Sequence, residues 1–294
     1  MRLALIGLGL IGGSIARAIR SGPATSAFTE TTAWSPAGRG PAAAAAAGII
    51  DRAAGSLADA VEGADLIVLA ADPLGCLDLL ERLADLGPPE FATADAGPTV
   101  TDVASTKARI VARADTLGLA FVGGHPMAGL ETSGFGASRP DLFVDRPWVL
   151  CAGAATRPVD LERVEALVAA CGATAQWLDP VDHDRAVAAI SHLPLAVAAS
   201  LVEAVAPAGD WPLARALAAG GWASATRLAR GDPAMGAGIA ATNAAELARR
   251  IRALRIQLGD WLADLEATPD DPAATAGRIR ARLGAARRAL AVDE

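Results

Sequence analysis

The residues of this chain whose types and spacing could do chemistry begin with three glycines near the N-terminus. Gly7, Gly9 and Gly12 have GxGxxG spacing, between the apolar run 3–6 and a helix-like pattern. In that setting the first glycine permits a tight turn, the second lets the backbone approach a pyrophosphate, and the third lets the helix pack closely on the sheet. The free N–H groups at the helix start attract phosphate. We therefore predict dinucleotide binding, with contacts from Gly7, Gly9, Leu10, Ile11, Gly12, Ala70 and Asp72.

Three further clusters hold polar residues that could move a proton or bind an acid. Residues 102–107 read D-x-x-S-x-K, residues 125–129 read H-P-M-A-G, and residues 191–194 read S-H-L-P. The first two follow apolar runs, and the carboxyl ends of strands are where a doubly wound fold binds its ligands. The three histidines of the chain, His125, His183 and His192, all lie in or near such sequences. These clusters are therefore the candidate active site.

The end of the second predicted strand bears on the choice of cofactor. Enzymes specific for NAD usually carry an acidic residue there, which binds the ribose 2′-hydroxyl. Here the strand ends at Trp34, Ser35 follows in place of an acid, and Arg39 lies four residues later. A hydroxyl and a guanidinium group suit a 2′-phosphate. Ser35 and Arg39 are therefore candidate contacts, and the sequence favours NADP over NAD.

Short apolar runs alternate with helical patterns through the first half of the chain. This alternation predicts an α/β fold with a doubly wound parallel sheet in a dinucleotide-binding domain, residues 1–179. From residue 180 strand patterns stop, and alanine- and leucine-rich helical patterns predict an all-α domain, residues 180–294. Later strands are expected at 31–34, 66–70, 99–103, 121–123, 148–151 and 175–178, and helices at 42–47, 74–86 and 161–171.

One helical pattern in the second half has a wide apolar stripe. Between residues 247 and 265, apolar side chains recur at spacings of three and four. Such a stripe is typical of a helix that packs in a core or against a second copy of the chain.

Composition excludes several classes of protein. The 294 residues carry a net charge of −7, and no long run of lysine or arginine favours nucleic-acid binding. The three cysteines are scattered, which argues against a disulfide framework or a metal site and favours a reducing, cytoplasmic location. No membrane span is expected, because no uninterrupted apolar run approaches the ~20 residues that a span needs.

Taken in order, the glycine motif and the polar clusters resemble the prephenate/arogenate dehydrogenase family of tyrosine biosynthesis. The family pattern continues to a late R-x-A-x-x-D-P-x-M, found here at residues 227–235, so the resemblance covers nearly the whole chain. It implies a nicotinamide-dependent oxidative decarboxylation. A cyclohexadienol loses a hydride from its ring carbon and its ring carboxylate as CO2, which gives 4-hydroxyphenylpyruvate from prephenate or tyrosine from arogenate. The resemblance also implies a homodimer paired through the helical domain.

The resemblance implies roles for individual residues. His125 matches the catalytic histidine, and a neutral imidazole can accept the proton of the ring hydroxyl as hydride leaves. Ser105 matches a serine that hydrogen-bonds near that hydroxyl, although a serine here could also cap the following helix. Arg227 matches the arginine that binds a substrate carboxylate. Ser191 and His192 match the segment that closes the site, whereas His183 could contact the substrate or serve as a polar cap.

Three positions depart from the family pattern. Leu195 stands where a second histidine often follows S-H-L-P, Leu130 where a threonine is common, and Gly236 where a tryptophan often follows D-P-x-M. They surround the expected substrate, so the preference for prephenate or arogenate stays open.

The sequence disfavours two alternative functions. A β-hydroxyacid dehydrogenase or imine reductase typically uses a lysine on its helical half, and residues 180–294 contain none. An inactive cofactor-binding relative is disfavoured because Ser105, His125 and Arg227 are all retained.

Overall fold

The computed structural model describes residues 1–22, 27–87, 97–130 and 132–291. Contacts within the chain divide it into two units, residues 1–244 and residues 245–294, which are described separately. The proposed domain boundary at residues 179 and 180 stays a prediction.

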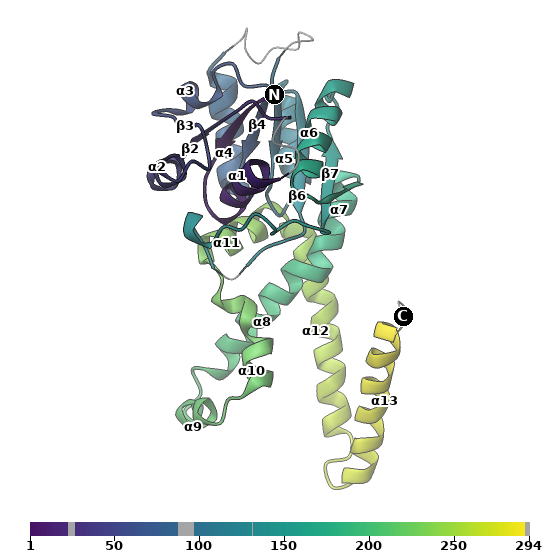
Figure 1. The fold of residues 1–294 in the computed structure, drawn as a ribbon. Coiled ribbons are helices and arrows are strands. Elements are labelled where there is room, and N and C mark those ends of the chain that lie inside the picture. Colours follow the sequence, from purple (N-terminus) through teal and green to yellow (C-terminus); the bar gives the residue numbers. More distant parts are fainter. Residues whose placement is uncertain (23–26, 88–96, 131, 292–294) are drawn as a thin grey trace. The chain divides into compact units, whose positions relative to one another are not determined.

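The first unit is built on an eight-stranded sheet with the order β3-β2-β1-β4-β5-β6-β7-β8 (Figure 1). The doubly wound fold is confirmed, and each expected strand is present. In one respect the sheet differs from the prediction, which is for parallel strands throughout. β7 pairs antiparallel to β6, and β8 runs parallel to β7, so the sheet is mixed. The strands are β1 Arg2–Ile6, β2 Glu30–Trp34, β3 Arg52–Ala53, β4 Leu66–Leu69, β5 Thr99–Asp102, β6 Phe121–Pro126, β7 Pro147–Ala152 and β8 Thr174–Trp177.

Both faces of this sheet are covered by helices, which explains why its central strands have no polar break. In β1, Leu3 and Leu5 pack toward one face with α1 and α6, whereas Ala4 and Ile6 pack toward the other with α3, α4 and α5. The helices are α1 Leu10–Ser21, α2 Arg39–Ala46, α3 Leu57–Val61, α4 Pro73–Asp85, α5 Ala108–Thr116 and α6 Pro158–Ala170.

The strand order sets the place of the ligand site. Ile6 at the end of β1 pairs with Trp34 on one side and Leu69 on the other, so the loops after β1, β2 and β4 leave the same edge of the sheet. The chain winds outward in opposite directions from β1 and β4, and the crevice between two such strands is where doubly wound folds bind ligands.

Helices continue the first unit beyond β8. They are α7 Pro180–Val187, α8 Leu193–Val205, α9 Trp211–Ala216, α10 Gly220–Ala225 and α11 Pro233–Thr242, with the 3-10 turns η1 Phe135–Ala137 and η3 Arg227–Arg230. Asp72, Asp179 and Asp232 each cap a helix that begins with proline, which fixes where α4, α7 and α11 start.

Between α7 and α8 the chain forms a single π-helical segment, η2 Ala188–His192. Although no span is expected from the sequence, the helical run Pro180–Val205 is, by length and composition, apolar enough to cross a membrane. Its first half carries His183, Asp184 and His192, all buried, in a network of polar contacts. These contacts join the first half of the run to the end of β6 and the start of α5.

The second unit consists of most of α12 Ala244–Glu266 and of α13 Pro272–Leu290. Asp264 of α12 binds Arg278 and Arg282 of α13, which joins the two helices. The predicted helix over 247–265 is confirmed, and much of its apolar stripe is uncovered. Ile251, Leu258, Leu262 and Leu265 are 42% to 60% exposed. An exposed stripe of this kind is suited to pairing with a second copy.

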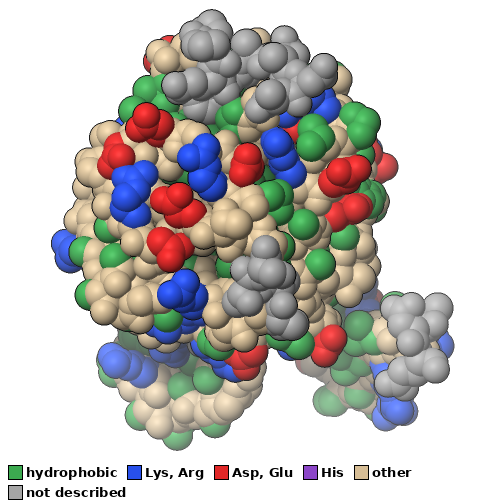
Figure 2. All heavy atoms as spheres, turned by 45° about the horizontal axis from the view of Figure 1, so that its top comes forward, with side chains coloured by type: hydrophobic (Ala, Val, Ile, Leu, Met, Phe, Trp, Pro, Cys, Tyr) green, Lys and Arg blue, Asp and Glu red, His purple; other side chains and the backbone are tan. Residues whose placement is uncertain are grey.

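On the face of the molecule in Figure 2, acidic and basic side chains are interspersed. This face therefore offers no single basic patch of the kind that binds nucleic acid.

Candidate active site

A cavity of about 420 Å³ opens at the carboxyl edge of the sheet. Its wall combines the glycine loop after β1, the loops after β4 and β5, the end of β6 and the start of α11. The residues that line it include Gly9, Leu10, Ile11, Ala70, Asp72, Ser105, His125, Leu130, Asp232 and Met235. The structure thus brings together most of the predicted cofactor contacts and both predicted catalytic residues.

The three motif glycines have different surroundings. Gly7 has a positive φ of 100°, and a Cβ there would lie 2.3 Å from the Ala70 carbonyl oxygen. A Cβ on Gly12 would lie 2.2 Å from the Gly7 carbonyl oxygen, so the turn and the helix could not approach as they do. Gly9 lines the cavity and has open space where a Cβ would be. These positions fit a dinucleotide whose pyrophosphate contacts the backbone at Gly9 and the start of α1.

His125 is placed by a buried ion pair next to it. Lys107 and Asp102 are both fully buried and bind each other. The Lys107 ammonium also donates to the Gly124 carbonyl oxygen at 2.7 Å, and the Gly124 N–H donates to Asp102 at 2.9 Å. The pair therefore holds the backbone directly before His125, at the end of β6.

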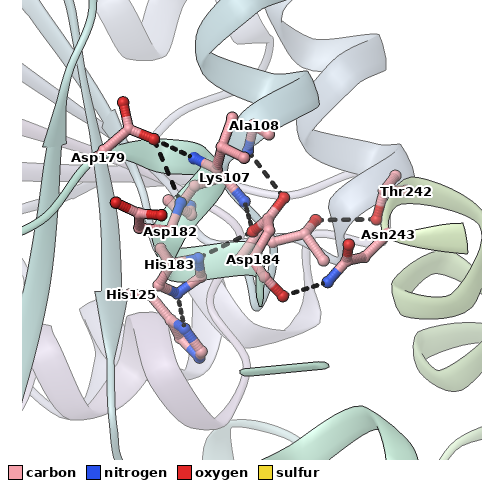
Figure 3. A network of polar contacts seen from close by, with 12 residues as sticks. Lys107, Ala108, His125, Asp179, Asp182, His183, Asp184, Thr242 and Asn243 are labelled. Carbon is pink, nitrogen blue, oxygen red and sulfur yellow. Dashed lines mark hydrogen bonds and ion pairs between the residues drawn. The ribbon is translucent and has the colours of Figure 1, made fainter. Parts of the chain in front are cut away.

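His125 is the first member of a chain of hydrogen bonds that runs away from the cavity (Figure 3). Its Nδ1 lies 2.8 Å from Nε2 of His183, and Nδ1 of His183 lies 2.8 Å from a carboxylate oxygen of Asp184. The two rings meet edge to face, with centroids 5.1 Å apart. His183 is only 1% exposed and does not line the cavity. The sequence leaves a substrate contact and a polar cap open for His183, and the structure places its ring behind His125.

Asp184 also joins α7 to the start of α5. Its carboxylate accepts the N–H groups of Lys107 at 2.7 Å and of Ala108 at 2.9 Å. These are free donors at a helix N-terminus, where negative charge is favourable. Lys107, not Ser105, stands at the N-cap of α5 and its side chain makes no capping bond, so Asp184 fills that role in place of the cap that Ser105 could have made.

Thr242 and Asn243, which directly precede α12, complete this network of hydrogen bonds. The Asn243 amide donates to the Asp184 backbone carbonyl at 2.7 Å and lies 3.3 Å from Nδ1 of His192. The Thr242 and Thr106 hydroxyls are 2.8 Å apart. Residues 242–243 thus connect the β5–α5 loop to the helical segment that carries the other two histidines.

Burial and neighbouring charges shift the pKa values of His125 and His192. Burial lowers the pKa of His125 well below its usual value, and the nearby His183, Lys107 and His192 lower it further. The imidazole is therefore neutral at physiological pH and able to accept a proton. Burial also lowers the pKa of His192, although Asp184 and the Ser105 backbone carbonyl act in the opposite direction.

The remaining predicted site residues lie outside the cavity wall. Ser191 is exposed on η2, and Arg227 is exposed on η3, one short turn before the wall residues Gly231 and Asp232. Ser35 and Arg39 lie at the end of β2 and the start of α2, beside the glycine loop. Their roles stay predictions.

Sequence reasoning missed Asp184 and Asn243. Asp184 had one visible signal, an acid directly after a histidine, but Asn243 had none. The network forms only when segments 51 to 136 residues apart meet.

Two of the departures from the family pattern are neighbours in space. A Cβ on Gly236 would lie 3.5 Å from a methyl carbon of Leu195, and Leu130 lines the cavity together with Met235. At these three positions the chain has leucine or glycine, where the family pattern more often has polar or aromatic groups.

Comparison with known proteins decides the family. The model for the nucleotide-binding domain of prephenate dehydrogenase matches residues 16–176, and the model for its dimerization domain matches residues 179–265. The chain belongs to the prephenate dehydrogenase family. Membership removes the imine reductase alternative, and it supports pairing of this chain as a homodimer.

Individual relatives agree with this placement. A prephenate dehydrogenase from Bacillus subtilis is 36% identical over 79% of this chain, but the match spans only 61% of that protein's length. The structure of Synechocystis arogenate dehydrogenase is 30% identical with a TM-score of 0.76, covering 99% of this chain and 100% of the other. A prephenate dehydrogenase from A. aeolicus, solved with hydroxyphenyl propionate and NAD+, is 25% identical with a TM-score of 0.81, each chain covered to 98%.

Proposed function

We propose that this chain catalyses the nicotinamide-dependent oxidative decarboxylation of a cyclohexadienol, prephenate or arogenate. The observation that carries the proposal is that Ser105 and the neutral His125 share one cavity wall with the glycine loop. The test is an assay of NAD+ and NADP+ reduction with each substrate. Reduction with either substrate is the expected result, and reduction with neither would refute the proposal.

Different residues of this chain would bind the cofactor and accept the proton. A bound nicotinamide dinucleotide supplies the hydride acceptor. The glycine loop and the start of α1 would hold its pyrophosphate. His125 accepts the proton of the ring hydroxyl as hydride departs, and Ser105 hydrogen-bonds beside it. Asp102 and Lys107 keep His125 in place.

The family and the exposed stripe on α12 support a homodimer as the working form of this enzyme. The scattered, unpaired cysteines support a cytoplasmic location. The substrate is a small acid.

Ser35 and Arg39 support a preference for NADP+. With no acid at the end of β2, nothing there repels a 2′-phosphate, and Arg39 is exposed nearby. We expect Ser35→Asp to shift the ratio of kcat/KM values toward NAD+ by about 10-fold or more, because the carboxylate repels the 2′-phosphate and can bind the ribose. Ala47→Asp, which adds the same charge at the exposed end of α2, is the control. A wild type that already reduces NAD+ far better would overturn this assignment.

Arg227 is proposed to bind a substrate carboxylate that is charged before and after reaction. Arg227→Ala should therefore raise KM by about 10- to 100-fold with a smaller change in kcat, because uniform binding is lost. Arg230→Ala, in the same exposed 3-10 turn, should leave KM within about twofold. A large loss of kcat at unchanged KM in Arg227→Ala would contradict this role.

A further inference from the structure

The directions of the hydrogen bonds behind His125 can be assigned from Asp184 outward. Both carboxylate oxygens of Asp184 already accept backbone N–H groups, and a carboxylate can only accept, so Nδ1 of His183 must donate to it. A neutral His183 that donates from Nδ1 has a lone pair on Nε2. That lone pair faces Nδ1 of His125 at 2.8 Å, so His125 donates from Nδ1.

This assignment leaves one nitrogen of His125 unprotonated. With its hydrogen on Nδ1, the neutral ring keeps a lone pair on Nε2, the nitrogen that a proton acceptor needs. His125 lines the cavity, whereas His183 and Asp184 are buried behind it.

We propose that His183 and Asp184 form a proton relay with His125, in which His183 fixes the tautomer of His125 and holds the substrate's proton while Asp184 balances the charge. The inference rests on the proposed function. His183 and Asp184 are positioning residues, since they act through His125 and do not touch the cavity.

The relay accounts for the movement of the proton. As the ring C–H bond breaks and its electron pair leaves as hydride, the ring C–O bond becomes a carbonyl and the hydroxyl proton moves to Nε2 of His125. The Nδ1 proton of His125 moves to Nε2 of His183, which becomes an imidazolium ion hydrogen-bonded to Asp184. When CO2 leaves, the electron pair of the broken C–C bond enters the ring and reaches the oxygen. The protons then move back and the phenol forms, with no net uptake or release of a proton.

The first test reads the tautomers in the free protein. The chain has only three histidines, so nitrogen-15 NMR of selectively labelled histidine can resolve each ring. Near pH 8 we expect His125 and His183 to carry hydrogen on Nδ1. His192 should carry it on Nε2, because its Nδ1 faces the Asn243 amide donor. A hydrogen on Nε2 of His125 would overturn the proposal without any assay of activity.

The second test distinguishes whether His183 only accepts the Nδ1 hydrogen bond of His125 or also takes up a proton during the reaction. A glutamine in His183→Gln can accept the Nδ1 hydrogen of His125 but cannot hold a further proton, whereas His183→Phe does neither. We expect kcat to fall about 10- to 100-fold in His183→Gln and further in His183→Phe, with KM within about threefold. His183→Gln at wild-type kcat would overturn the relay.

The control is Asp179→Ala, which removes the N-cap of the same helix and leaves the relay in place. Its unfolding temperature should fall, but its kcat should stay within about twofold of wild type. An equal loss of kcat in Asp179→Ala would show that helix stability, not proton transfer, explains the His183 variants. If the wild type is inactive on both cyclohexadienols, the proposed function fails, whereas the tautomer assignment is still decided by NMR.

Discussion

Replacing His125 with asparagine is expected to lower kcat by about 10²- to 10⁴-fold, the usual range for a general acid–base group. His125 acts on a proton that moves only in the transition state, so KM should change little. Steady-state kinetics with prephenate and arogenate would measure both constants. The dissociation constant of the nicotinamide cofactor should be unchanged, which controls for damage to the cavity. Near-normal kcat in His125→Asn on both substrates would refute the mechanism.

The same histidine predicts the pH dependence of the wild type. Activity needs the neutral imidazole and is lost as pH falls through the pKa of His125. Because burial and three nearby groups lower that pKa, the acid limb of kcat/KM should lie well below pH ~6.5, the usual value for histidine. The buried neutral ring also affects stability. The unfolded chain binds the proton first as pH falls, so stability declines from about pH 6.5 downward.

Removing the ammonium group of Lys107 should destabilise the fold strongly. In Lys107→Met the Asp102 carboxylate stays fully buried without its charged partner, and breaking such a pair costs about 3–5 kcal/mol. Denaturant unfolding would measure the loss. Arg113→Met is the matched control, because Arg113 and Glu81 form a largely exposed pair that is worth about 1 kcal/mol or less.

A double variant distinguishes two causes of the stability loss in Lys107→Met: the unpaired charge of Asp102 and a general loss of packing. Asp102→Asn combined with Lys107→Met removes both charges and keeps one carbonyl oxygen, which can accept one of the two backbone N–H groups, of Ala104 or of Gly124, that bind separate oxygens of Asp102. It should recover a large part of the lost free energy of unfolding. A single Lys107→Met variant within about 1 kcal/mol of wild type would contradict the argument.

The elements that the sequence predicts well are those determined by local pattern. The buried strand β1, the glycine turn and α1 follow from an apolar run, three glycines and a helical period within 21 residues. The same holds for α12, although its exposed stripe becomes visible only in the structure. These features depend on neighbours in sequence, so a single chain suffices to find them.

Features that depend on distant contacts could not be predicted. The antiparallel direction of β7 depends on how the segment after β6 returns to the sheet, and no residue pattern in β7 records it. The role of His183 is similar. Its sequence neighbours allow a cap or a substrate contact, and only the meeting of β6 with α7 places it against His125.

The buried ion pair has a consequence for labelling this protein. Lys107 is the only lysine in the chain, and its side chain is fully buried. Amine-specific acylating reagents and crosslinkers, which need an accessible neutral amine, therefore have no side chain to modify in the folded molecule. Acylation at residue 107 would occur only when β5, β6 and α5 separate, so its rate at a single site would report the opening of the fold.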